Sequence, residues 1–373
     1  MTVINQQKNI YANLGIKTLI NAQGTYTSLG GSLMPPEVVQ AMAEAAGWFV
    51  PIAELQEKVG ARIAGLLKVP AAMVTAGAAS AITVATAACM TRDKPAAIEN
   101  LPVTTGLKDE IVIQKSHKCG YEPQMLLLGA KLVWVETLTE LQSAINPRTA
   151  MLFFLNRYEP LGQIKRQDWV RAGKERAVPV FNDAAADVPP AGRLSEYFHQ
   201  GFDLVAFSGG KGLRGPQASG LLLGRADLIA AGRHAISPQM GIGRGMKVGK
   251  EEMMGLLAAV ERFLTMDHEA EWRLWETRVA EMIELLAGIP GMNAQRDVPE
   301  IANHSPHLLL EWSRWHVALS ATEVVQKLRE GDPPIAALAE GEHGLRIAVW
   351  TLRDDEHRIV AKRIRGILTD KKS

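Results

Sequence analysis

The chain has 373 residues, of which 47% are hydrophobic and 22% charged, and its formal net charge at pH 7 is +1. This length allows a large domain and a smaller one. The near-zero charge provides no strong field to attract nucleic acid or an anionic membrane, and no run approaches the ~20 apolar residues of a membrane span. The two cysteines have no metal-ligand spacing and indicate a reducing compartment. We therefore expect a cytoplasmic protein that binds neither nucleic acid nor membrane.

The first residues, 1–36, show little regular pattern and are predicted to form an N-terminal arm. Two helices are predicted next, one starting at Pro35-Pro36 and one over residues 52–67. From residue 71 apolar strands alternate with helices or loops, which favours a mostly parallel sheet covered on both faces. The predicted strands cover residues 71–75, 110–114, 131–135, 150–155, 178–181, 204–207 and 220–223.

A long helical stretch, about residues 250–287, is predicted to lead into a small α+β domain. In that domain we expect strands over 305–312 and 345–350 and helices over 320–329 and 354–367, the last one capped by Asp354. The predicted organisation is therefore an arm over residues 1–36, a large domain over 37–265 and a small C-terminal domain over 266–373.

The most informative stretch is a glycine-rich loop between the predicted strands 204–207 and 220–223. It holds Lys211, which Gly210 and Gly212 flank. Glycines let the backbone turn sharply and let a cofactor approach closely. A lysine whose pKa is lowered by burial can form a Schiff base. An isolated loop of this kind would favour a solvated surface lysine, but the wider sequence favours the Schiff base.

A turn of small residues, Thr75–Ser80, follows the first strand of the large domain and precedes an Ala-rich helix. Its backbone N–H groups, including those of Gly77 and Ala78, would face an anion at the helix N-terminus. Such turns occur in most α/β proteins, so the turn alone is weak evidence for phosphate binding.

Two further polar residues follow predicted strands. Asp183 lies where an acidic side chain points into the ligand crevice of an α/β sheet, and it would hold a protonated ring nitrogen, with Ala185 small enough to pack on a flat ring. His117 would stack on an aromatic cofactor or carry a proton. The alternatives are a helix-capping aspartate and a structural histidine.

The order of these features, anion turn, His, Asp and Lys, resembles that of pyridoxal-phosphate enzymes with the aspartate-aminotransferase fold (fold type I). Ser208-Gly209-Gly210-Lys211 with Gly215-Pro216-Gln217 resembles the Schiff-base lysine segment of bacterial selenocysteine synthase, the seryl-tRNA selenium transferase. Other segments resemble the smaller relatives of that family, the D-glucosaminate-6-phosphate ammonia-lyase subgroup: Asn21–Thr25, Glu54–Gln56, Thr75–Ala81 and Ile242–Glu251. The resemblance covers about residues 10–365 and is most specific at the lysine loop.

The resemblance implies a pyridoxal 5'-phosphate (PLP) cofactor bound through Lys211, with Asp183 on the pyridine nitrogen and His117 against the ring. It places Gly77, Ala78 and Ser208 near the cofactor phosphate. Arg346 falls where many relatives bind a substrate carboxylate, and a guanidinium offers that group two parallel hydrogen bonds. Arg244 and Lys247 would bind an anion in a neighbouring subunit, because relatives of this fold place the cofactor at a dimer interface.

The expected activity is therefore that of a PLP-dependent lyase on a small amino acid or an amino-sugar acid. Lys211 would remove the α-proton, and loss of a β-substituent would release a 2-oxo acid and ammonia. A racemase or epimerase, an aldolase, a transaminase and a non-catalytic binding protein of the same fold remain alternatives. The tRNA-dependent relatives carry an N-terminal domain without a counterpart here, so we expect no tRNA substrate. No metal is expected, because His304 and His307 lack further ligands.

Overall fold

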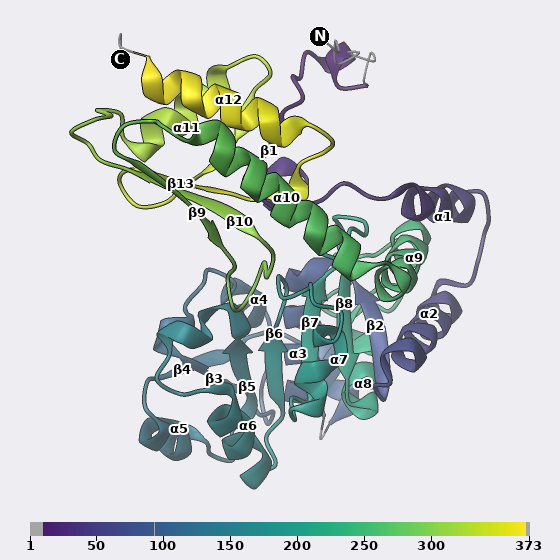
Figure 1. The fold of residues 1–373 in the computed structure, drawn as a ribbon. Helices are drawn as coiled ribbons and strands as arrows, with labels where there is room; N and C mark the ends of the chain where they lie inside the picture. Colours follow the sequence, from purple (N-terminus) through teal and green to yellow (C-terminus); the bar gives the residue numbers. More distant parts are fainter. Residues whose placement is uncertain (1–9, 93, 371–373) are drawn as a thin grey trace. The chain divides into compact units, whose positions relative to one another are not determined.

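The computed structural model describes residues 10–92 and 94–370, which are drawn as a ribbon in Figure 1. They divide into two compact units. The large unit comprises residues 31–266 and 300–304, and the small unit comprises residues 10–30, 267–299 and 305–370. In this part of the chain, no helix combines the length and the apolar character needed to cross a membrane.

The large unit is built on a seven-stranded sheet with the order β2-β8-β7-β6-β5-β3-β4. Its strands are β2 (Ala71–Thr75), β3 (Glu110–Gln114), β4 (Lys131–Val135), β5 (Thr149–Leu155), β6 (Val180–Asp183), β7 (Leu204–Ser208) and β8 (Gly220–Gly224). Only β8 runs antiparallel to its neighbours, so the mostly parallel sheet predicted from the sequence is confirmed. The carboxyl ends of the five parallel strands from β7 to β4 consequently lie along one edge.

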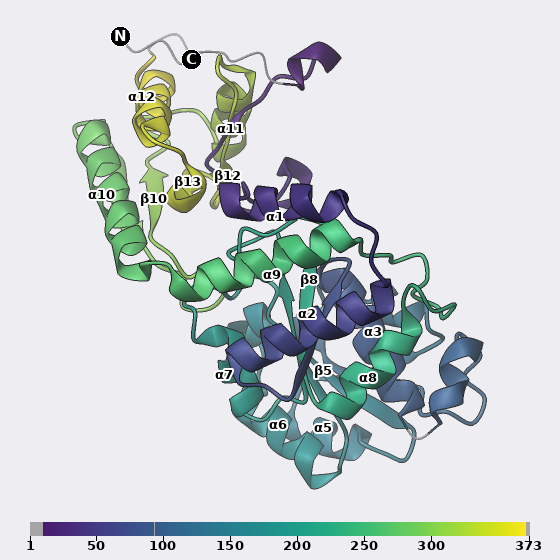
Figure 2. The ribbon, with the colours of Figure 1, turned by 90° about the vertical axis from the view of Figure 1, so that its right-hand side faces the viewer.

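Both faces of this sheet are covered. Consecutive residues of β5, Phe153 and Phe154, are fully buried in two different apolar clusters, as the alternation of side chains along a strand requires. One cluster includes residues of α2, α6, α7 and α9, and the other includes residues of α3 and α8. Helix α1 lies along α9 (Figure 2). The helices are α1 (Pro36–Ala46), α2 (Ile52–Leu67), α3 (Gly77–Thr91), α4 (Pro123–Leu126), α5 (Leu138–Ala144), α6 (Arg166–Glu175), α7 (Arg193–His199), α8 (Ala226–Ala235) and α9 (Lys250–Thr265).

The small unit contains a four-stranded antiparallel sheet, β12-β13-β10-β9, and a two-stranded parallel sheet in which β1 pairs with β11. Three helices accompany the sheets, and their apolar sides share one core with β10 and β13. The elements are β1 (Ile20–Asn21), α10 (His268–Leu286), β9 (Met292–Asp297), β10 (His307–Trp312), α11 (Ala321–Glu330), β11 (Ile335–Ala336), β12 (Leu338–Ala339), β13 (Gly344–Ile347) and α12 (Glu356–Thr369).

The helical stretch 250–287 consists of a helix to about residue 266 and a second one that continues from it, as predicted. The second helix, α10, has its own N-cap, Asp267, whose carboxylate accepts the Ala270 N–H at 2.8 Å. The predicted cap Asp354 is wrong, since it has a φ of +30° and α12 begins two residues later. An N-cap residue adopts the extended region instead.

Candidate active site

Asp183 and Lys211 lie at the carboxyl edge of the large sheet. Asp183 is the last residue of β6, and its register partners are Leu155 on β5 and Ala206 on β7. Strand β7 ends at Ser208, three residues before Lys211. Asp183, Ser208 and Lys211 are therefore brought together by the pairing of neighbouring strands.

The loop that carries Lys211 is held by backbone contacts. The N–H of Gly209 donates to the Ser219 carbonyl at 2.8 Å, and Ser32 donates both its N–H (2.9 Å) and its hydroxyl (3.0 Å) to the Gly210 carbonyl. A Cβ built on Gly209 would lie 2.0 Å from the Ser219 hydroxyl oxygen. The glycine is thus required by close approach, and the loop presents Lys211 from a fixed backbone.

The two ionisable groups of this edge are perturbed by burial. Desolvation raises the pKa of Asp183 to about 6, although the Lys211 charge and the Ala185 N–H, which donates to the carboxylate at 3.0 Å, act to lower it. Desolvation also lowers the pKa of Lys211, against the raising effect of Asp183. Among the described residues neither group forms an ion pair within 4.0 Å. A buried amine of lowered pKa beside a buried carboxylate of raised pKa is the kind of arrangement expected at a functional site.

The turn after β2 has features that an anion site requires. Gly77 has a φ of +81°, and a Cβ added there would meet no atom within 4 Å, so the space in front of it is open. The Thr75 hydroxyl fixes the turn by donating to the Gly77 carbonyl at 2.9 Å. Helix α3 begins here with Gly77 and Ala78, and in its first turn the buried Ser80 hydroxyl has no hydrogen-bond partner among the described residues. A phosphate at this helix N-terminus would satisfy that group.

His117 has other contacts than those of a ring-stacking residue. It is fully buried, and its Nδ1 accepts the Leu155 N–H at 3.1 Å. Its ring meets Phe154 edge-on, with 4.6 Å between the ring centroids. Burial lowers the His117 pKa to about 4, so the ring is neutral at pH 7. These contacts favour a role in positioning the end of β5 over stacking or proton transfer.

Two residues that sequence reasoning missed belong to the same edge. Tyr121 has a half-exposed ring, and its pKa is raised mainly by burial and further by the charge of Asp183. Arg157 follows the end of β5 by two residues, is exposed, and its charge acts to lower the pKa of Lys211. The rule that found Asp183, a polar residue just past a buried parallel strand, would have found Arg157 if it had been applied to β5.

Arg346, the predicted carboxylate-binding residue, lies on β13 of the small unit and is held by two carboxylates. Its Nε donates to Glu340 at 3.0 Å, and its Nη1 donates to Asp297. A substrate carboxylate would have to displace one of these partners. The contacts therefore argue against the role that the resemblance implies for Arg346.

Arg244 and Lys247 are exposed residues of the glycine-rich segment before α9. The Arg244 guanidinium donates to the Ser237 hydroxyl at 3.3 Å. Neither residue forms an ion pair with a carboxylate in the described part of the chain. Both cations are therefore available to an external anion.

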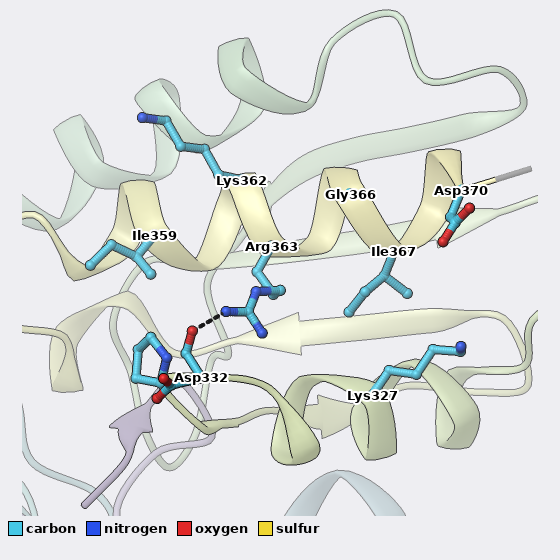
Figure 3. A pocket seen from close by; sticks show the side chains of 9 residues that line it. Lys327, Asp332, Ile359, Lys362, Arg363, Gly366, Ile367 and Asp370 are labelled. Carbon is cyan, nitrogen blue, oxygen red and sulfur yellow. Dashed lines mark hydrogen bonds between the residues drawn. The ribbon is translucent and has the colours of Figure 1, made fainter.

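A groove of about 590 Å³ lies in the small unit between α11 and α12. Figure 3 shows its lining, in which Arg363 donates to the carbonyl of Asp332 across the groove. None of the predicted site residues lines it. The groove is thus a feature of the small unit alone.

No protein-family model matches the chain. D-glucosaminate-6-phosphate ammonia lyase of Salmonella typhimurium (strain 14028s / SGSC 2262) is 30% identical over 372 residues, which cover 96% of this chain and 98% of that protein. The chain belongs to this ammonia-lyase family. A solved structure of D-glucosaminate-6-phosphate ammonia-lyase has a TM-score of 0.85 to this chain at 29% identity, covering 98% of this chain and all of the other.

Two other relatives carry different names. The 5'-C-glycyluridine monooxygenase-decarboxylase of Streptomyces sp is 31% identical over 375 residues, which cover 96% of this chain and 92% of that protein. L-seryl-tRNA(Sec) selenium transferase of Moorella thermoacetica is 26% identical, over 93% of this chain and 81% of the relative. The predicted resemblance, the fold type I architecture, the PLP cofactor and the assignment to PLP-dependent lyases are confirmed by these relationships.

The residues at the carboxyl edge fit PLP. Lys211 offers an amine of lowered pKa, Asp183 a buried carboxylate without a cation, and the Gly77 turn an open anion site with an unsatisfied hydroxyl. These groups match the aldehyde, the pyridine nitrogen and the phosphate of the cofactor in turn.

Proposed function

We propose that this protein is a PLP-dependent ammonia-lyase that converts an amino-sugar acid, or a small amino acid, into a 2-oxo acid and ammonia. The observation that carries the proposal is the presence of Lys211 and Asp183, both with pKa values shifted by burial, at one sheet edge of a chain that matches an ammonia lyase over 96% of its length. D-Glucosaminate 6-phosphate, the substrate in that relative's name, is the first candidate.

The proposed roles follow from the contacts of each residue. Lys211 holds the cofactor and, once the substrate amine has replaced it, takes the α-proton on Nζ, for which its lowered pKa suits it. Asp183, oriented by the Ala185 N–H, keeps the pyridine nitrogen protonated. The bound cofactor supplies an electron sink for the carbanion. The β-hydroxyl would leave as water with the proton that Lys211 Nζ has taken. The enamine that is released would tautomerise to an imine, and water would hydrolyse the imine to the 2-oxo acid and ammonia.

The remaining predicted residues take binding roles. Gly77 and Ala78 at the start of α3 and Ser208 at the end of β7 bind the cofactor phosphate. Ala185 leaves space for the ring. His117 acts through the end of β5, which it holds by the Leu155 N–H.

A second candidate function is oxidative decarboxylation, which the Streptomyces relative favours by its name and its 31% identity. Both candidates require a substrate with an amine and a carboxylate on the same carbon. They differ in the need for oxygen and in the fate of the carboxylate.

The deciding experiment incubates the PLP-loaded protein with D-glucosaminate, its 6-phosphate and a set of amino acids, in air and without oxygen. A lyase releases 2-oxo acid and ammonia in equal amounts under both conditions. A monooxygenase-decarboxylase consumes oxygen and releases carbon dioxide. Deuterium exchange at the α-carbon without either product would contradict both and support a racemase.

We also propose that the protein is at least a homodimer and works in the cytoplasm. The segment after α1 exposes large apolar side chains, with Trp48 70% and Phe49 fully exposed, as expected of an interface. Arg244 and Lys247 would then bind an anion in the neighbouring subunit. Mixing inactive Lys211→Ala and Arg244→Ala chains tests this, because a shared site regains activity in hybrids. The two free cysteines support the location.

A further inference from the structure

A second buried carboxyl group, that of Asp187, follows Asp183 by four residues. Asp187 is only 1% exposed. Its N–H donates to the Ala184 carbonyl at 3.1 Å, so the chain turns back on itself directly after β6. Asp187 is thereby kept close to the end of the strand that carries Asp183.

The carboxylate of Asp187 is held by two side chains from neighbouring segments. Its Oδ2 accepts the side-chain amide of Asn156 at 2.5 Å and the Tyr197 hydroxyl at 3.0 Å. Asn156 directly follows β5, Tyr197 lies on α7, and both are almost completely buried. The Asn156 amide also donates to the Tyr197 hydroxyl at 2.9 Å. The three side chains therefore form a closed triangle of hydrogen bonds, which fixes each of them relative to the others.

The residue after Asp187 packs against the lysine loop. A Cβ built on Gly212 would lie 2.0 Å from the Val188 carbonyl oxygen, so this close approach requires a glycine. Val188 and Leu213 also share one apolar cluster. Since Val188 directly follows Asp187 and Gly212 directly follows Lys211, the two ionisable residues flank one contact between the two segments. The triangle consequently supports the backbone that presents Lys211.

The charged groups around Asp187 favour its ionised form. Burial raises its pKa, whereas its two hydrogen-bond donors and the guanidinium groups of Arg193 and Arg166 act to lower it. Arg193 donates to the backbone carbonyl of Asp187 at 3.2 Å, and Arg166, which is paired with Glu159, lies 5.5 Å from the centroid of the Tyr197 ring. Two donors on one oxygen and two nearby cations suit a carboxylate.

The charge of Asp187 reaches both groups that are proposed to hold the cofactor. Burial lowers the pKa of Lys211 and Arg157 acts in the same direction, whereas Asp183 and Asp187 act to raise it. Burial raises the pKa of Asp183 to about 6, and Asp187 contributes to that rise. Once Asp183 is paired with a protonated ring nitrogen, its own charge is compensated. Asp187 then remains as the buried carboxylate that acts on the Lys211 nitrogen.

We propose that Asp187 is a positioning residue of the cofactor site, which keeps the nitrogen of Lys211 protonated while that nitrogen holds the cofactor. The proposal rests on the proposed function, since it takes Lys211 as the point of attachment. A proton on this nitrogen makes the carbon bound to it more electrophilic. The substrate amine therefore replaces Lys211 more readily when the charge of Asp187 is present.

The test compares Asp187→Asn and Tyr197→Phe with Asp168→Asn, a control at an aspartate on α6 that pairs with Arg171. Circular dichroism and cofactor absorbance first establish that each protein folds and binds PLP. The absorbance of the bound cofactor is then recorded against pH, because it changes where the Lys211 nitrogen loses its proton. Borohydride trapping and peptide mapping separately establish whether the cofactor is attached to Lys211, so a wrong attachment site is distinguished from a wrong role of Asp187. Neither readout requires turnover.

In Asp187→Asn we expect the midpoint of the absorbance change to move to lower pH by about one pH unit. A shift of this order is expected when one charge is lost at an effective dielectric constant of about 20. Tyr197→Phe keeps the charge and should shift the midpoint by less than about half as much, and Asp168→Asn should not shift it. An unchanged midpoint in Asp187→Asn would overturn the proposal. Equal shifts in Asp187→Asn and Tyr197→Phe would also overturn it, because the triangle would then act through loop packing alone.

A second measurement on the full cofactor-free chain covers the case in which Asp187→Asn does not load PLP. Acetic anhydride labels an amine only in its unprotonated form, so the labelling of Lys211 is followed against pH by mass spectrometry. Its midpoint should move to lower pH in Asp187→Asn and stay unchanged in Asp168→Asn. Asp187→Ala takes the place of Asp187→Asn if the latter does not fold. Equal midpoints in wild type and the Asp187 variant would contradict the proposal.

Discussion

Charged side chains lack ion-pair partners at the carboxyl edge of the large sheet, within the described chain, whereas in the sheet of the small unit they are paired. In the large unit Asp183 and Lys211 each act on the other's pKa, yet neither forms an ion pair within the described chain. In the small unit Arg346 is held by Asp297 and Glu340. Buried unpaired charge costs stability, so its retention indicates groups reserved for a ligand, whereas paired charge indicates structure.

The largest effect is expected from Lys211→Ala. This change removes the group that holds the cofactor and takes the α-proton, so turnover should fall by about 10⁴-fold or more, since a general base alone contributes about 10²–10⁴. Borohydride treatment should no longer trap cofactor on the protein. The control is Lys250→Ala, at a lysine already paired with Glu251. Borohydride should trap the cofactor on this variant as it does on wild type. Trapped cofactor mapping to Lys247 or Lys250 in the wild type would contradict the assignment.

Asp183→Asn should lower kcat by about 10²–10³, the range seen when one preorganised electrostatic group is lost. The variant should still fold and bind PLP. Near-normal turnover in a loaded Asp183→Asn protein would show that Asp183 caps local structure and does not tune the ring nitrogen.

The cofactor-free protein provides a separate test of Asp183. Its pKa is raised in the folded state from 3.8 to about 6, so folding favours the protonated form and wild-type stability falls as pH rises through this window. At pH 7 Asp183→Asn should therefore be more stable than wild type by up to about 3 kcal/mol, and the difference should vanish below pH 4. Urea unfolding of both proteins between pH 4 and 7 measures it. If the stability difference between the two proteins did not change with pH, another group would already compensate the Asp183 charge in the folded protein.

His117→Gln should reduce stability by about 1–3 kcal/mol at pH 7, because the Leu155 N–H loses its buried acceptor. Wild-type His117 is held neutral with a pKa of about 4, so unfolding takes up a proton below pH 6.5 and wild type loses stability on acidification. The gap between the two proteins should narrow by up to about 3 kcal/mol between pH 6.5 and 4. Loss of PLP binding with unchanged stability would instead restore the stacking role.

How much of the fold and the site could be predicted from the sequence depends on whether the contacts involved are local along the chain. Continuous apolar strands predict the sheet, and a position just past such a strand indicates Asp183, because these signals are local. Lys211 was indicated by its glycine-rich loop together with the order of the other motifs along the chain. The burial of His117 was not predictable, since it depends on Phe154 and Leu155, which lie 37 and 38 residues further along the chain. The pairing of Arg346 likewise depends on Asp297, 49 residues away.

The smallest effect is expected from Arg346→Gln. Its guanidinium is already bound by Asp297 and Glu340, whose side chains are 34% and 40% exposed, so solvent screens the two carboxylates that remain. Partly exposed ion pairs of this kind contribute about 1 kcal/mol or less, and the loss of stability should not exceed that amount. If Arg346 is structural, KM in Arg346→Gln should change less than about threefold. A larger rise of KM would mean that the substrate displaces Asp297 or Glu340 from Arg346. In that case Asp297→Asn, which removes one carboxylate partner of Arg346, should lower KM below the wild-type value. If Arg346 is purely structural, Asp297→Asn should leave KM unchanged.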